Sequence, residues 1–227
     1  MNARSLPAAL ILTSLLLLAG CGGSGTPAST ASSPTSTNPP ATASPATSAT
    51  PAPAIGVEGV ALEQGPQIAP AATTQTGSVD AIRCGATEQL TYHIHAHLAV
   101  YVHGAPRTLP AGIGIPGAAL QQTPQGPIAV GGQCYYWLHT HTTDGVIHIE
   151  SPAKRIYTLG EFFDEWHQPL SAGRVGAVSG RVTALLDGRR FTGDPRSIPL
   201  APHAVIQLDV GAPAAPPQPF SWAQTSL

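Results

Sequence analysis

Histidine is the residue type that could carry chemistry in this chain of 227 residues. Six of the nine histidines fall in two short motifs, in which they alternate with other residues. The first motif holds His93, His95 and His97, and the second holds His139, His141 and His148. Successive side chains of a strand point to opposite faces of a sheet, so histidines two residues apart share one face. Such a face can present several imidazole nitrogens to a metal ion.

The second motif predicts a β-hairpin around Asp144–Gly145, a dipeptide typical of two-residue type I′ turns. With that turn, His141 lies opposite His148 and His139 lies opposite Glu150. Directly opposed residues share a face, with Cβ atoms about 5 Å apart. We therefore expect Glu150 to join the histidines as a fourth ligand, as a partner that orients an imidazole, or as a general base for metal-bound water.

A ligand set rich in nitrogen suits a borderline metal ion, and we expect Zn(II) or Cu(II) as the cofactor. A Cu(I) carrier usually offers sulfur ligands, and the only methionine is Met1. Two alternatives stay open: a metal-dependent enzyme that activates water with Glu150 as base, and a metal-free binding module whose histidines gain protons near pH 6. The remaining histidines, His103, His167 and His203, stand alone and predict no site.

The N-terminus has the features of an export signal. Arg4 precedes an apolar run from Leu6 to Gly20, which is too short to span a membrane. The run ends in Leu18-Ala19-Gly20-Cys21, which resembles the lipobox of bacterial lipoproteins. The resemblance implies that residues 1–21 are a signal peptide and lipobox, and that lipidated Cys21 anchors an extracytoplasmic protein to a bacterial membrane.

The other two cysteines, Cys84 and Cys134, are expected to form a disulfide, because disulfides persist outside the cytoplasm. Closing a loop of about 50 residues stabilises the fold by roughly 3–4 kcal/mol through the entropy of the unfolded chain. The alternative is thiolate ligation of a metal. The alternation of side chains along a strand disfavours thiolate ligation, since Cys134 falls on the strand face opposite to His139 and His141.

Composition divides the rest of the chain into three parts. We expect residues 22–77 to be a disordered tether. Residues 22–54 are mostly Ser, Thr, Ala and Pro and cannot bury enough apolar surface to stabilise a fold. Residues 78–211 are long enough for a single domain with a core. Residues 212–227 are rich in proline and predict a loose tail.

The domain must place its histidines on strands, and alternation over residues 92–102 predicts one of them. A helix is expected at about 158–168, since Thr158 and Glu161 form a capping box ahead of an aromatic stripe. Further strands are expected over 181–186, 189–192 and 204–210. The predicted fold is mainly β or α+β: an antiparallel sheet, as a β-sandwich or a β-grasp-like fold, with one short helix on one face.

Charge excludes one class of partner. The net charge is −2, and only 10% of the residues are charged. Nucleic-acid binding needs clustered basic residues, which this chain lacks, so we expect no nucleic acid as partner. No protein partner is indicated.

The core resembles an uncharacterised family of bacterial extracytoplasmic proteins. The shared features are the strand from His93 to His97, the turn from His139 to Glu150 and the helix motif from Leu159 to Phe163. The resemblance covers about residues 84–211 and implies no known activity.

Overall fold

The computed structural model describes residues 53–70 and 73–227. The expected signal peptide, Cys21 and residues 22–52 of the expected tether lie outside the described residues. In the described part of the chain, no helix has the length and apolarity needed to cross a membrane.

The centre of the fold is a seven-stranded sheet in the order β14-β13-β16-β3-β8-β7, with β4 paired to β3 beside this path. Its strands are β3 (Tyr92–Val102), β4 (Ala105–Arg107), β7 (Leu138–His139), β8 (Val146–Ser151), β13 (Val182–Leu186), β14 (Arg189–Phe191) and β16 (Val205–Val210). The β16–β3 pair is parallel, and the other pairs are antiparallel. The sheet is therefore mixed, and the predicted mainly β or α+β class is confirmed.

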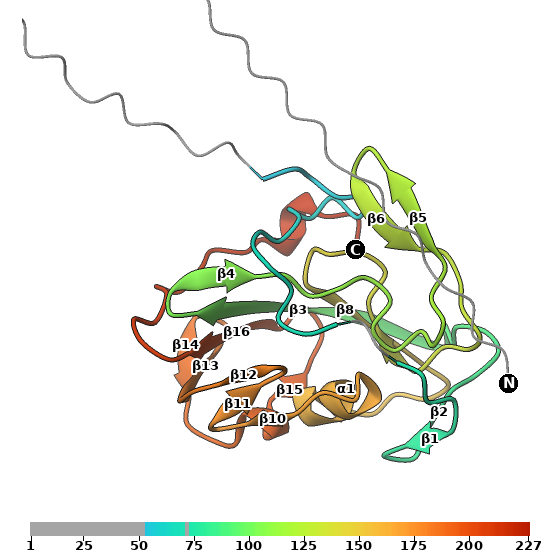
Figure 1. Ribbon diagram of the computed structural model, residues 1–227. Coiled ribbons are helices and arrows are strands. Elements are labelled where there is room, and N and C mark those ends of the chain that lie inside the picture. The colour runs from blue at the N-terminus through green and yellow to red at the C-terminus, as the bar shows by residue number, and fades with distance from the viewer. Residues whose placement is uncertain (1–52, 71–72) are drawn as a thin grey trace, which may run out of the picture. The chain divides into compact units, whose positions relative to one another are not determined.

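Smaller elements surround this sheet (Figure 1). They are β1 (Ser78–Val79), β2 (Ile82–Arg83), β5 (Leu120–Thr123), β6 (Gly126–Ala129), β9 (Tyr157–Thr158), β10 (Leu170–Ser171), β11 (Arg174–Val175), β12 (Val178–Ser179), β15 (Pro199–Leu200), the single α-helix of the described residues α1 (Leu159–Glu165), and the 3₁₀ turns η1 (Pro195–Ser197) and η2 (Trp222–Gln224). In Figure 1, α1 and β10–β12 lie on one side of the sheet and the β5–β6 hairpin lies on the other.

The two faces of the sheet differ in polarity because the strands alternate. Even-numbered side chains of β3, such as Leu98 and Val100, are buried in the hydrophobic core. The same core contains Phe162, Phe163 and Trp166 from the helical segment. The odd-numbered histidines of β3 face the opposite side. One face of the sheet therefore packs into the hydrophobic core, and the other face carries the polar histidine side chains.

The helix forms where the sequence predicts it but is shorter. The capping box is present, since Thr158 accepts from the backbone N–H of Glu161 and Glu161 accepts from that of Thr158. The expected end at residue 168 is wrong, because α1 ends at Glu165 and His167 has a left-handed φ of 60°. A continuing helix cannot contain that backbone conformation.

The predicted hairpin register in the second motif is wrong by two residues. His139 pairs with His148, and Leu138 pairs with Ile149. The loop backbone bonds to distant segments instead of closing a two-residue turn: the N–H of Thr140 donates to Ile113, and the carbonyl of His141 accepts from Ala129. Because the shift is an even number, each side chain keeps its predicted face.

The packed unit extends beyond the expected limits of 78 and 211. Val60 and Ile68 are buried, although their segment was expected to belong to the tether. The expected tail is also held in place. The backbone N–H of Gln218 donates to the side chain of Gln207, and the Ser226 hydroxyl donates to the carbonyl of Glu58. Polar side chains of β16 offer the partners that the tail backbone needs.

Candidate metal centre

Strand pairing brings the two histidine motifs side by side. Antiparallel pairing of β3 with β8 places His95 opposite His148 and His93 opposite Glu150. Pairing of β7 with β8 places His139 on the other side of His148. His148 therefore lies between histidines of two neighbouring strands.

Four residues form the first donor group: His139, His141, His148 and Glu150. Each offers one ligand atom, and these atoms lie within 4.8 Å of one another. His139 is fully buried, His148 and Glu150 are nearly so, and the side chain of His141 is 17% exposed. This group could hold a metal ion.

Backbone carbonyls orient two of the imidazoles. Nδ1–H of His139 donates to the carbonyl oxygen of Tyr136 at 2.9 Å, and Nδ1–H of His141 donates to that of Ala129 at 3.0 Å. A carbonyl can only accept, so each ring carries its proton on Nδ1 and leaves the Nε2 lone pair free. A hydrogen bond on the far ring nitrogen is the usual way in which proteins position a metal-binding histidine.

Carboxylates enclose His148. Its Nε2–H donates to Oε1 of Glu58 at 3.0 Å, and its Nδ1 lies 3.5 Å from Oε1 of Glu150. Burial opposes a charge on His148, but its contacts with the carboxylates of Glu150 and Glu58 outweigh it and raise its pKa to about 9. For Glu150, burial raises the pKa, but the close contact with His148 and the nearby histidine charges lower it to about 2. Glu150 is therefore an anion at neutral pH, as a ligand must be.

The buried polar atoms of this group lack partners. Nε2 of His139, Nδ1 of His148 and Oε2 of Glu150 make no hydrogen bond to any described residue. Buried polar groups in folded proteins are nearly always paired, because an unpaired one costs free energy. Nε2 of His139 and Oε2 of Glu150 can bind zinc or copper directly, and Nδ1 of His148 can do so once the ion displaces its proton. A cation at this point would then satisfy all three atoms.

A second donor group consists of His93, His95 and His148, whose ligand atoms also lie within 4.8 Å of one another. Nε2 of His93 is 3.0 Å from Nε2 of His95 and 3.1 Å from Oε1 of Glu150. Burial, followed by the charges of neighbouring histidines, lowers the pKa of His95 to about 4. The His95 ring is therefore neutral at neutral pH.

His97 lies apart from both groups. Its Nε2–H donates to the carbonyl oxygen of Asp144 at 3.1 Å, and its ring stacks on Phe220 with centroids 3.9 Å apart. Burial lowers its pKa to about 4. Five of the six predicted histidines converge with Glu150, and His97 instead contacts the C-terminal segment.

Two acidic residues at the site were missed by the sequence analysis. Glu58 contacts His148, and Oε1 of Glu88 lies 3.4 Å from Nε2 of His141. Glu58 is the first charged residue after the uncharged stretch 5–57, a signal that could have marked it. Glu88 has no comparable signal.

No family model matches the chain. Comparisons with curated proteins and with solved structures also find no match. The geometry of these side chains therefore carries the functional argument.

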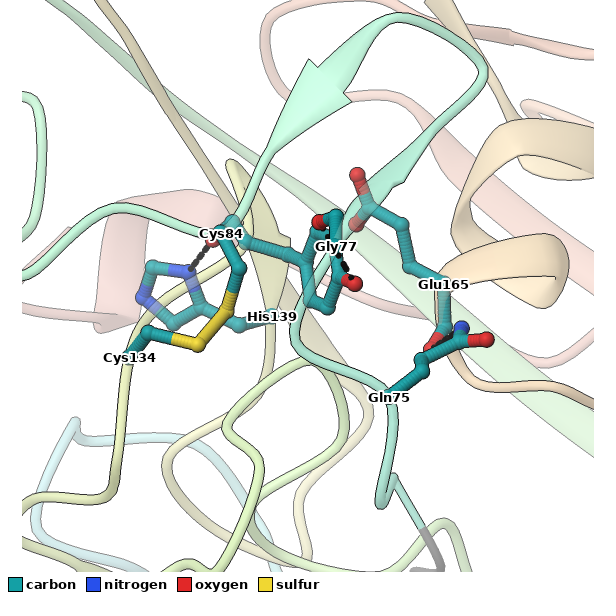
Figure 2. Close-up of a disulfide and its surroundings, with 7 residues drawn as sticks. Gln75, Gly77, Cys84, Cys134, His139 and Glu165 are labelled. Carbon is teal, nitrogen blue, oxygen red and sulfur yellow. Dashed lines mark hydrogen bonds between the residues drawn. A yellow bond between two sulfur atoms is a disulfide. The ribbon is translucent and has the colours of Figure 1, made fainter.

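The expected disulfide between Cys84 and Cys134 is confirmed, with Cα atoms 5.4 Å apart. An isolated bridge between Gly85 and Tyr135 continues the connection along the backbone. Figure 2 shows this disulfide together with His139 and the hydrogen bond that its ring donates. The cross-link joins the segment before β3 to the segment that orients His139.

Proposed function

We propose that the protein is a lipid-anchored extracytoplasmic protein that binds a transition-metal ion, Zn(II) or Cu(II). The ligands of this ion are His139, His141, His148 and Glu150. One observation carries the proposal: three of these residues have buried donor atoms without a hydrogen-bond partner. A bound cation removes that cost.

The donor set supports the choice of metal. Three imidazole nitrogens and one carboxylate oxygen match the tetrahedral sites that zinc prefers, and imidazole also suits Cu(II). The hydrogen bonds of His139 and His141 to backbone carbonyls leave Nε2 as the ligand atom. The rings are thus oriented before the ion arrives, which lowers the entropy cost of binding.

One observation favours binding over catalysis. A cavity of about 600 Å³ on the same face is lined by His97, Tyr101 and Phe220 but by none of the four ligands. This cavity therefore does not present a substrate to the ion.

A pH switch near pH 6 is poorly supported. Burial is the largest influence on both His95 and His139, and it lowers their pKa values to about 4 and about 3. The carboxylates beside His148 outweigh its burial and raise its pKa to about 9. None of these three histidines changes its charge near pH 6.

The lipid anchor is supported by sequence alone. Arg4, the apolar run from Leu6 to Gly20 and the ending Leu18-Ala19-Gly20-Cys21 match a lipoprotein signal. The Ser/Thr/Ala/Pro-rich stretch that follows would extend the metal-binding domain away from the membrane.

Metal content tests the binding proposal. The protein is purified without a histidine tag, loaded with Zn(II) or Cu(II), dialysed and analysed for metal. We expect at least about one equivalent in the wild type and a loss in the His139→Ala/His141→Ala variant. The control is His167→Asn, which removes an exposed histidine at the end of α1 and keeps a residue type that tolerates its φ of 60°. A wild type that retains less than about 0.1 equivalent overturns the proposal.

Fractionation tests the anchor separately. The full chain expressed in a bacterial host should incorporate a labelled fatty acid and sediment with membranes. Cys21→Ser should lose both properties, because no acyl chain can be attached. Equal membrane association of the two proteins, without label, would reject lipidation and leave metal binding untouched.

A further inference from the structure

We infer that the histidine face binds two metal ions, the second held by His93 and His95 and joined to the first through the carboxylate of Glu150. The inference rests on the proposed function, which assigns the first ion. It adds a second site, with a divalent transition-metal ion as its ligand.

The donors of the second site already converge. Nε2 of His93 and Nε2 of His95 lie 3.0 Å apart. Two nitrogens bound tetrahedrally to zinc, at about 2.0–2.1 Å each, lie roughly 3.3 Å apart. A small separation of the two rings therefore opens a coordination site between them.

One ion cannot use every donor on this face. His139, His141, His148 and Glu150 already complete a four-coordinate shell, the number that zinc usually takes in proteins. His93 and His95 share a donor group with His148 but with neither His139 nor His141. They are not needed as ligands of the first ion and can bind another one.

Glu150 faces both sites with different oxygens. Its Oε1 lies 3.1 Å from Nε2 of His93, and its Oε2 lies 3.8 Å from Nε2 of His139. A carboxylate placed in this way can give one oxygen to each ion, as in the two-metal sites of hydrolytic enzymes. The His148 ring lies between the sites, with its centroid 4.7 Å from those of His95 and His141.

The local charge suits two divalent cations. Glu58, Glu88 and Glu150 all contact histidines of this face. In the described part of the chain, the ion-pair contacts of these three carboxylates are with histidines and include neither Lys nor Arg. When an ion displaces the proton of His148, the negative charge of Glu58 and Glu150 becomes available to offset the bound cations.

Exposure predicts an order of affinity. The side chain of His93 is 40% exposed, whereas that of His139 is fully buried. The second ion is therefore closer to solvent, and a chelator should remove it first. The first ion should stay bound longer.

Zn(II) stoichiometry tests the inference. Metal-free wild type titrated with Zn(II) in competition with a chromophoric chelator should bind two equivalents in two resolved steps. His93→Ala/His95→Ala should keep the tighter step and lose the weaker one, and His167→Asn should bind as the wild type does. One equivalent in the wild type, unchanged in His93→Ala/His95→Ala, overturns the second site and leaves the proposed function standing. No bound zinc in the wild type overturns both.

Cu(II) spectroscopy on the wild type gives a test that needs no variant to fold. At one equivalent, the electron paramagnetic resonance spectrum should be that of an isolated Cu(II) ion. At two equivalents, ions joined by Glu150 should interact, and the spectrum should broaden and gain a half-field signal. A spectrum that merely doubles in intensity would show two distant ions and overturn the bridged site.

Discussion

The imidazole of His139 is held by the backbone of Tyr136, whose carbonyl oxygen accepts its Nδ1–H at 2.9 Å. Tyr136 follows Cys134 by two residues, and Cys134 is cross-linked to Cys84. The same cross-link lies four residues before Glu88, which contacts His141. The disulfide therefore ties the segment whose carbonyl orients His139 to the segment whose carboxylate contacts His141, in addition to stabilising the fold.

Removing this disulfide should weaken both stability and metal binding. For the Cys84→Ser/Cys134→Ser variant we expect the free energy of unfolding to fall by about 3–4 kcal/mol, because the unfolded chain regains the entropy of an open loop. Affinity for Zn(II) should fall about 10-fold, because the support of His139 is loosened. Urea unfolding of the metal-free protein and a zinc competition titration measure the two effects. Unchanged affinity in a folded variant would reject the positioning role.

Glu58 should tune the affinity through His148. Glu58→Gln keeps the shape of the side chain but removes the negative charge 3.0 Å from Nε2 of His148. We expect Zn(II) affinity to fall about 10-fold, the lower end of effects seen for residues that contact metal ligands. The matched control is Glu88→Gln, because Glu88 is more exposed and lies 3.4 Å from His141. Equal effects of the two substitutions would contradict a special role for Glu58.

The faces of the sheet could be predicted from the sequence because strands have a period of two. Alternation alone placed His93 and His95 opposite the core side chains of β3, and the structure agrees. The hairpin register could not be predicted in the same way. The register depends on the hydrogen bonds of the loop backbone. Thr140, His141 and Thr143 form theirs with segments outside the hairpin.

The contacts that the N-terminal and C-terminal segments make with the histidine face could not be predicted either, for a similar physical reason. Glu58 reaches His148 because its segment lies against the loop that follows β7, where the backbone N–H of Glu63 donates to the carbonyl of Thr143. Periodicity within a strand says nothing about such packing. The position of Phe220 on the ring of His97 depends likewise on the hydrogen bonds that Gln207 and Asp209 form with the C-terminal segment. Local composition predicted loose chain at both places.

Glu165 should make the stability of the metal-free protein depend on pH. Its side chain is fully buried in the described structure, one oxygen accepts the N–H of Leu138 at 3.2 Å, and burial raises its pKa well above the ordinary value of 4.5. The folded state therefore binds this proton more tightly than the unfolded state does. The contribution to stability is complete below about pH 4.5 and is lost as the pH rises toward the folded pKa.

Glu165→Gln should remove this dependence, because an amide has no proton to release in this range. Relative to wild type, the variant should gain stability between about pH 4 and about pH 7. Urea unfolding at both pH values, without metal, measures the difference. A stability difference that is the same at both values would show that Glu165 does not titrate as its burial implies.

Gly114 should be needed for both the fold and the proposed metal site. Its φ is 71°, its carbonyl accepts the N–H of Tyr136, and an added Cβ would overlap the carbonyl oxygen of Leu138 and lie 3.0 Å from Cβ of His139. Gly188 has a nearly identical φ of 72° but open space around its Cβ position. Alanine at either position costs about 1 kcal/mol or more through backbone strain.

Comparing Gly114→Ala with Gly188→Ala separates the effect of backbone strain, which both variants share, from the effect of displacing β7, which only Gly114→Ala should cause. Both variants should lose stability in urea unfolding, and Gly114→Ala should lose more, because β7 must move to admit the methyl group. Only Gly114→Ala should weaken Zn(II) binding in the competition titration, since that movement shifts His139 away from Glu150. Equal losses of stability with unchanged zinc affinity in both variants would mean that the position of β7 does not control the metal site.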